Sequence, residues 1–202
     1  HDGFVNNDET IGTYIPYSDN MLGWTNGAAY AVQTNWDDKD NTVYYNGWLV
    51  TQFGQETTRI NVCPPGFHIP TVQEWENLFT AVSSEVADSR RNRNPQDVGA
   101  VLKETGTCAV GECDTDGDGY VDVYWYFAGS PQNAGENLYD FSVRGYGYTA
   151  SDDGTLSDAD IGIEFFEDAY FWSSTRYGQE SKAYYTQFQN ISRNAILNYD
   201  NG

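Results

Sequence analysis

A helical spacing of apolar residues follows Pro70. Four of them lie on one face of an α-helix: Trp75, Leu78, Phe79 and Val82. Thr71 occupies the N-cap position, and Glu74, three residues later, completes a capping box. The pattern predicts an amphipathic helix from about Val72 to about Ser84.

Weaker patterns predict the other elements. Val98, Val101 and Leu102 share a helical face, which favours a second short helix from Asp97 to Leu102. Residues 164–176 are rich in aromatic side chains, and residues 182–199 alternate in part between apolar and polar positions. Such patterns are typical of strands, so paired strands are predicted late in the chain, with one or two more within residues 1–60. The set predicts an α+β domain.

The composition limits the possible partners. The chain has 202 residues, enough for one large domain with a buried core, and 16% of them are aromatic. We find no internal repeat or linker, so residues 1–202 are expected to form a single domain. Thirty acidic and ten basic side chains give a net charge of −20. This charge argues against nucleic acid and anionic lipid as partners, and no apolar run is long enough to insert into a membrane.

An Asp-rich loop is the most specific chemical signal. Carboxylates stand at loop positions 1, 3, 5 and 9, contributed by Asp114, Asp116, Asp118 and Asp122. Gly119 occupies position 6, where a sharp turn is needed, and Tyr120 at position 7 offers its backbone carbonyl. The pattern predicts a bound Ca²⁺, because a hard cation relieves the repulsion among the carboxylates. The alternative is a solvated acidic turn.

The end of this loop differs from that of an EF-hand. Position 12 is Trp125 rather than a bidentate glutamate, so the loop is more like the Asp-rich calcium loops of extracellular repeat proteins. Glu112, Asp140 or water are the candidates to complete the coordination. Tyr124, Trp125 and Tyr126 follow the loop and are predicted to stack on a sugar ring or a protein ligand, although alternate members of this run are expected in the core.

Three cysteines bear on the compartment. Cys108 and Cys113 are close enough in sequence for a short disulfide loop, which is favoured over two thiols and indicates an oxidising compartment. Cys63 makes the number odd. An odd cysteine in a secreted protein indicates a pairing beyond this sequence or a buried thiol.

Catalytic signals are absent from the sequence. The only histidines are His1 and His68, and His68 is expected to be a structural, hydrogen-bonded side chain. No nucleophile elbow, zinc-binding His-Glu-x-x-His motif or phosphate loop occurs. The chain is therefore predicted not to be an enzyme, although paired carboxylates of a glycosidase cannot be identified without geometry.

Three motifs carry a family resemblance. They are Cys63-Pro-Pro-Gly-Phe-His-Ile-Pro-Thr-x-x-Glu-Trp75, Leu102-Lys-Glu-Thr-Gly106 and Phe171-Trp-Ser-Ser-Thr175, the last followed by Ala183-Tyr-Tyr185. Their order and spacing over about residues 44–200 resemble the Fibrobacter succinogenes major paralogous domain (FISUMP). The resemblance implies a surface or secreted protein of Bacteroidetes or Fibrobacteres. It also implies a fold related to C-type lectins and formylglycine-generating enzymes, with two helices, twisted antiparallel strands and long loops.

The chain departs from this family in two places. The resemblance implies a final strand, roughly Ser-Val-Arg-Cys, whose cysteine pairs with Cys63. The sequence ends at Gly202 before such a strand, so we expect a continuation of the chain, or another chain or segment, to supply it. Residues 108–126, which include the Asp-rich loop, resemble an insertion into the family's domain, so the family implies no function for them.

Three functions follow as hypotheses. The first is a calcium-stabilised adhesion or ligand-binding domain at the cell surface, which binds a glycan or a surface protein through its loops. The second is a tip or assembly subunit of a surface fibre, completed by a donor strand. The third, a polysaccharide-active enzyme, is favoured only by the habitat of the family.

Overall fold

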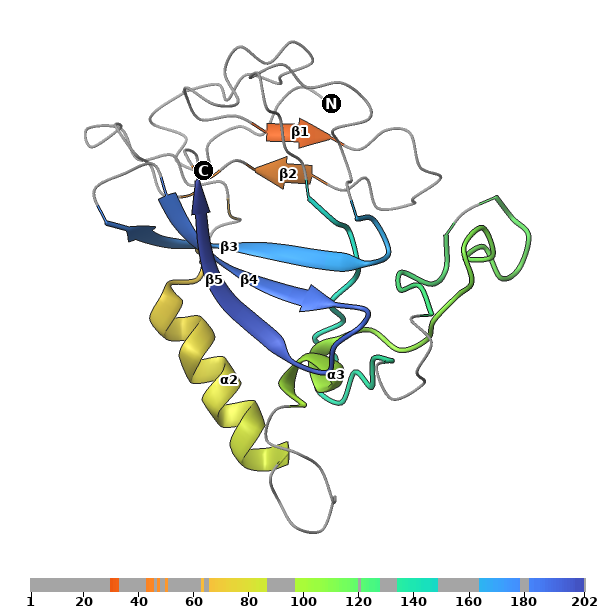
Figure 1. The fold of residues 1–202 in the computed structure, drawn as a ribbon, viewed down its shortest axis with the longest axis horizontal. Coiled ribbons are helices and arrows are strands. Elements are labelled where there is room, and N and C mark those ends of the chain that lie inside the picture. The colour runs from red at the N-terminus through yellow and green to blue at the C-terminus, as the bar shows by residue number, and fades with distance from the viewer. Residues whose placement is uncertain are drawn as a thin grey trace.

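The structure is a computed structural model. It describes residues 30–32, 43–45, 47, 50, 63, 66–86, 97–119, 121–127, 134–148, 164–178 and 182–201. The elements in these residues are β1 (Tyr30–Val32), β2 (Val43–Tyr45), α2 (Val72–Val86), α3 (Val98–Leu102), β3 (Asp168–Tyr177), β4 (Lys182–Gln189) and β5 (Ala195–Asn201) (Figure 1). None of the described helices is long and apolar enough to cross a lipid bilayer.

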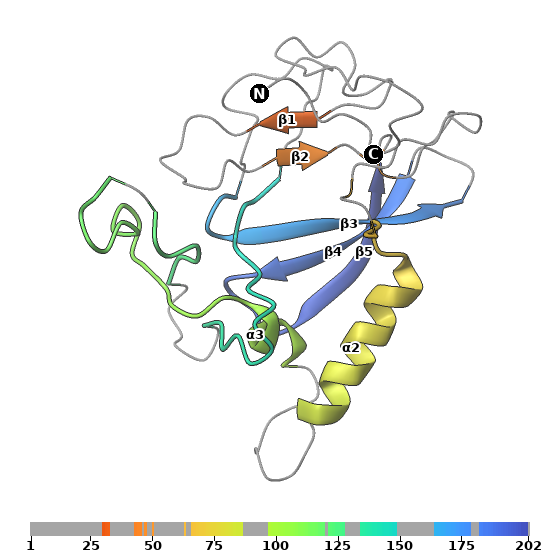
Figure 2. The same cartoon turned by 180° about the vertical axis from the view of Figure 1, so that it is seen from behind.

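Two antiparallel sheets form the framework. β1 pairs with β2, and β3, β4 and β5 form a three-stranded sheet in that order. α2 and α3 lie on one side of the larger sheet, whereas β1 and β2 lie beyond β3 on the other side, as the opposite view in Figure 2 also shows. The prediction of an α+β fold with two helices and late paired strands is confirmed.

The capping box sets the start of α2. The backbone N–H of Thr71 donates to Oε2 of Glu74 (2.8 Å), and the backbone N–H of Glu74 donates to Oγ1 of Thr71 (3.2 Å). Nε2 of His68 lies 2.8 Å from Oε1 of Glu74. The Thr71 hydrogen bonds, followed by His68, lower the pKa of Glu74 to about 2. His68 is therefore hydrogen-bonded, as predicted, although its side chain is 66% exposed.

The main core joins both helices to the sheet. Its buried members are Val82, Val98, Val101, Leu102, Trp125, Val143, Ala169 and Phe188. Leu78 and Phe79 of α2 pack against this cluster, so the helical face predicted from the sequence is the buried one. The core is rich in aromatic rings, since Trp75 lies with its ring centroid 6.0 Å from those of Phe79 and Phe171.

The turn between β4 and β5 is attached to α3. The backbone N–H of Ala100 donates to the carbonyl of Arg193 (2.8 Å). A Cβ atom on Gly99 would lie 2.5 Å from the backbone of Asn194, so the close approach needs glycine. The Arg193 guanidinium forms ion pairs with Asp97 (2.9 Å) and Glu136 (2.7 Å). These contacts fix the sheet over α3.

The register gives the larger sheet two chemically different faces. Ala169 of β3 opposes Phe188 of β4, and both belong to the core. Because side chains alternate along a strand, Asp168, Tyr170 and Trp172 point to the opposite face. The β1–β2 pair meets this face at one end, where Nε1 of Trp172 donates to the carbonyl of Tyr45 (2.7 Å).

Candidate functional site

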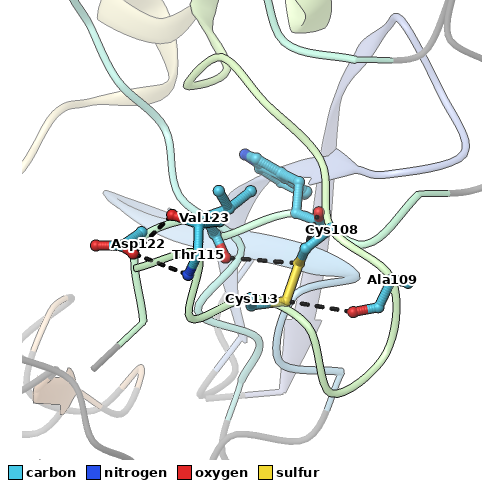
Figure 3. The surroundings of a disulfide bond; sticks show 7 residues. Cys108, Ala109, Cys113, Thr115, Asp122 and Val123 are labelled. Atoms are coloured by element: carbon cyan, nitrogen blue, oxygen red, sulfur yellow. Dashed lines mark hydrogen bonds between the residues drawn. A yellow bond between two sulfur atoms is a disulfide. The ribbon is translucent and has the colours of Figure 1, made fainter. Parts of the chain in front are cut away.

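A disulfide holds the start of the Asp-rich loop. Cys108 and Cys113 are bonded, with their Cα atoms 5.1 Å apart, as predicted (Figure 3). Both residues are buried, at 5% exposure each. Cys108 also lies beside the chain that leaves the loop: its N–H donates to the carbonyl of Trp125 (2.9 Å), and its carbonyl accepts from Phe127 (2.8 Å).

The two ends of the loop meet at Cys113. Its carbonyl accepts hydrogen bonds from the backbone N–H groups of Asp122 (3.0 Å) and Val123 (3.2 Å). Across the loop, a carboxylate oxygen of Asp122 accepts from the backbone N–H and the hydroxyl of Thr115, at 3.0 and 2.8 Å (Figure 3). The loop is therefore closed at its base by a covalent bond and by hydrogen bonds.

Two glycines shape the interior of the loop. The carboxylate of Asp114 accepts from the backbone N–H groups of Gly117 (2.7 Å) and Gly119 (2.9 Å). Gly119 has a φ of +89°, in the left-handed region that L side chains rarely adopt. The sharp turn expected at loop position 6 is present.

Three carboxylates of the loop are brought together. Oxygen atoms of Asp114, Asp116 and Asp122 lie within 4.8 Å of one another, and all three residues are exposed. Two oxygens that bind one Ca²⁺ at about 2.4 Å are separated by at most about 4.8 Å, so this spacing fits a shared calcium ion.

The other predicted calcium ligands do not lie in this group of carboxylates or are not described by the structure. Asp118 does not belong to this group, although its N–H donates to Asp116 (3.2 Å). Tyr120 lies outside the described residues. Among the described residues, neither Glu112 nor Asp140 joins the three carboxylates. The remaining coordination of a cation would therefore come from water, from backbone carbonyls or from a movement of Asp118.

The prediction that Tyr124 and Trp125 contact a ligand is wrong. Their exposures are 3% and 2%. Trp125 lies in the main core, and its Nε1 donates to the carbonyl of Val143 (2.9 Å). Tyr124 lies in a second buried cluster with the disulfide. Both rings fill the interior because the chain that leaves the loop runs between core elements, so neither has a face for a sugar or a protein.

Tyr126 and Cys63 are half-buried. The Tyr126 ring lies 4.8 Å from that of Phe166, and burial, followed by the charge of Glu167, raises its pKa. No contact with a ligand is tested for Tyr126, so its binding role stays a prediction. Cys63 is a thiol in this structure, and burial raises its pKa.

The second buried cluster connects the loop with β3. It contains Cys108, Cys113, Tyr124, Phe165 and Phe166. The backbone continues the connection, because Tyr126 donates to Phe166 (2.8 Å) and Phe166 donates to Gly145 (2.6 Å). The base of the loop and the turn that precedes β3 are thereby joined through one buried cluster and one set of hydrogen bonds.

A polar cluster on β3 and β4 was not predicted from the sequence. We call it the Tyr170 cluster, and it consists of Glu164, Asp168, Tyr170, Gln187 and Gln189. The Tyr170 oxygen lies 2.8 Å from a Glu164 carboxylate oxygen and 3.0 Å from Oδ2 of Asp168. Burial, followed by the hydrogen bond to Glu164, raises the pKa of Tyr170. Its sequence signal is the pair Glu164 and Asp168, four residues apart, but only the strand register adds the glutamines.

The motifs quoted in the sequence analysis meet in the fold. The carbonyl of Pro70 accepts from the N–H of Ser174 (2.9 Å), and the hydroxyl of Thr175 accepts from the N–H of Val72 (3.0 Å). Nζ of Lys103 donates to the carbonyls of Gln189 (2.8 Å) and Ser192 (2.9 Å). These residues hold α2, α3 and the sheet together, so the motifs mark a framework rather than a ligand site.

Comparison with known proteins agrees with this framework. The model of the Fibrobacter succinogenes major domain matches residues 6–200. No curated protein and no solved structure matches the chain. The matched range includes all the described helices and nearly all of β5. The chain belongs to the Fibrobacter succinogenes major domain family.

Proposed function

We propose that the chain is a non-enzymatic, calcium-stabilised ligand-binding or adhesion domain of a bacterial surface protein, on a C-type-lectin-like framework. The observation that carries the proposal is the Asp-rich loop, whose three clustered carboxylates are tethered at the base by the Cys108–Cys113 disulfide. Such a loop is suited to a calcium-containing and oxidising medium, and this supports an extracellular location.

Calcium has a structural role in this proposal. Three carboxylates within 4.8 Å repel one another, and the N–H groups of the loop offset only part of that charge. A bound Ca²⁺ orders the loop, and the second buried cluster passes this order to Phe165 and Phe166. The ligand, a glycan or another surface protein, binds to surfaces supported in this way, whereas the net charge of −20 disfavours nucleic acid.

Calcium titration tests the proposal. At a free calcium concentration ten times the Kd, we expect the free energy of unfolding to rise by about 1.4 kcal/mol, with a matching heat of binding. Asp116→Asn is the most informative variant, since the Asp116 carboxylate accepts one backbone hydrogen bond (3.2 Å) whereas that of Asp114 accepts two. Asp116→Asn should bind calcium at least about tenfold more weakly.

A matched control removes a charge elsewhere. Glu76 is exposed on α2, and α2 lies apart from residues 108–119 in both views of the fold, so Glu76→Gln should leave the calcium response unchanged. Absence of both heat and stabilisation in the parent protein would refute the calcium site. Equal losses in Glu76→Gln and Asp116→Asn would show a response to total charge instead of a site.

The edge of the larger sheet favours a second function, that of a tip or assembly subunit of a surface fibre completed by a donor strand. Among the described strands, β5 pairs only with β4, so its other edge offers backbone groups to an added strand. Ile196 on β5 is 39% exposed. If the chain assembles through this edge, sedimentation should show concentration-dependent oligomers that Ile196→Lys reduces, because an edge lysine opposes strand addition. A parent protein that remains monomeric at high concentration would exclude self-assembly.

A further inference from the structure

A row of aromatic rings crosses the sheet face opposite the core. Tyr148 lies 5.1 Å from Tyr170, Tyr170 lies 5.6 Å from Tyr185, and Tyr185 lies 6.0 Å from Trp172, all between ring centroids. The four residues come from the loop before β3, from β3 and from β4, and each is partly exposed. The row therefore presents apolar ring surface beside the polar Tyr170 cluster.

The Tyr170 cluster has more acceptors than donors. The Tyr170 hydroxyl has one proton, yet its oxygen lies within hydrogen-bond distance of both Glu164 (2.8 Å) and Asp168 (3.0 Å). Nε2 of Gln187 donates to Tyr170 (2.8 Å) and to Asp168. The hydroxyl can thus donate to only one of the two carboxylates at a time. Asp168 keeps the amide donors of Gln187 and Gln189, so the exposed Glu164 carboxylate has room for a donor from a ligand.

Asp168 also has an oxygen that can accept a further hydrogen bond. The residue is only 6% exposed. The hydrogen bonds that its side chain accepts from described residues come from Tyr170, Gln187 and Gln189, and all of them end on Oδ2. The second oxygen, Oδ1, accepts none from the described residues and is not one of the buried side-chain atoms that lack a partner, so it is open to solvent. A hydroxyl or amide of a ligand can therefore donate to Oδ1.

We infer that the Tyr170 cluster and the adjoining aromatic row form a binding site for a neutral glycan. Sugar hydroxyls donate to the Glu164 and Asp168 carboxylates, and the glutamine amides offer both donors and acceptors. The C–H faces of successive sugar units pack on the aromatic row. This inference rests on the proposed ligand-binding function and places the glycan on the sheet face instead of on Tyr124 and Trp125.

The charge of the cluster selects among glycans. Its hydrogen-bond donors are a hydroxyl and two amides, so the described residues that bond to the two carboxylates include no cation. Lys103 interacts electrostatically with Asp168 from the core side, but its Nζ donates to the carbonyls of Gln189 and Ser192. A glycan with carboxylate or sulfate groups would meet like charge here, whereas a neutral one would not.

Isothermal titration with oligosaccharides tests the site. Cellohexaose, mannohexaose and xylohexaose serve as neutral probes, and trigalacturonate is the anionic counterpart. We expect binding of at least one neutral probe and none of trigalacturonate. Tyr170→Phe keeps the ring and removes the hydroxyl, and it should weaken binding at least about tenfold. Tyr148→Ala removes one end of the aromatic row and the apolar area that it offers to a sugar ring, and it should weaken binding comparably.

Tyr139→Phe is the matched control. Tyr139 is 38% exposed and belongs neither to the Tyr170 cluster nor to the aromatic row, so the same chemical change there should leave glycan affinity unchanged within about twofold. Binding that Tyr139→Phe abolishes and Tyr170→Phe retains would overturn the inference, as would preferred binding of trigalacturonate. If Tyr170→Phe does not fold, Tyr148→Ala decides.

The same samples separate this inference from the proposed function. Calcium is titrated into each protein before the oligosaccharides are added. A normal calcium response with no binding of any neutral probe overturns the glycan site and leaves the calcium-stabilised domain intact. Loss of the calcium response with glycan binding retained contradicts the proposed role of calcium and supports the glycan site.

Discussion

Trp125→Ala is expected to lower the free energy of unfolding by about 3–5 kcal/mol. The indole is 2% exposed and packs in the main core, where Val101, Leu102 and Val143 are its fellow members. Truncation leaves a cavity that these rigid neighbours cannot fill, and it also removes the donor to the carbonyl of Val143. Urea denaturation followed by circular dichroism measures the loss.

The control lies two residues away. Phe127 is 51% exposed, so Phe127→Ala should change the free energy of unfolding by no more than about 0.5 kcal/mol. The pair distinguishes a core tryptophan from a ligand contact. A ligand-contacting Trp125 would instead lose affinity on truncation while stability stayed near that of the parent, and that result would contradict the burial observed in the structure.

The local parts of the fold could be predicted from the sequence. α2 is specified within a few residues, since Thr71 and Glu74 cap each other and the apolar face has one clear period. The disulfide is also local, because five positions separate Cys108 from Cys113. The loop between Asp114 and Asp122 was predictable for the same reason, as its turn residues and its carboxylates are neighbours in the sequence.

The non-local parts could not be predicted. The run from Tyr124 to Phe127 consists of large aromatic residues, so no alternation distinguishes the buried Trp125 from the exposed Phe127. The Tyr170 cluster depends on the register of β3 against β4, in which Tyr170 opposes Gln187. A one-residue shift would move Gln187 to the other face, and no sequence pattern fixes that register.

The burial of Lys103 could not be predicted from the sequence either, and it has a larger effect on the free energy of unfolding. Its motif is recognisable in the sequence, yet burial of the lysine, at 1% exposure, depends on carbonyls that lie 86 and 89 residues further along. Its Nζ also lies 5.1 Å from the centroid of the Trp125 ring. Burial, followed by the nearby charge of Arg193, lowers the pKa of Lys103 to about 8, and Asp168 partly opposes the shift.

This pKa predicts a rise in stability at alkaline pH. The unfolded chain keeps the ordinary lysine pKa of 10.5, so between about pH 8 and 10.5 it binds more protons than the folded chain. The cost of the buried charge is complete below pH 8 and is relieved as the pH rises. Relative to Lys103→Met, the parent should gain about 2.5 kcal/mol of unfolding free energy between about pH 7 and pH 10.

The comparison with Lys103→Met isolates this one group. All other ionisable groups are common to both proteins, so their contributions cancel in the difference. Urea denaturation at half-unit steps of pH gives the two curves. A difference that stays constant from pH 7 to pH 10 would mean that Lys103 titrates normally, and a difference that falls would mean that its two carbonyl partners favour the charged form more than burial opposes it.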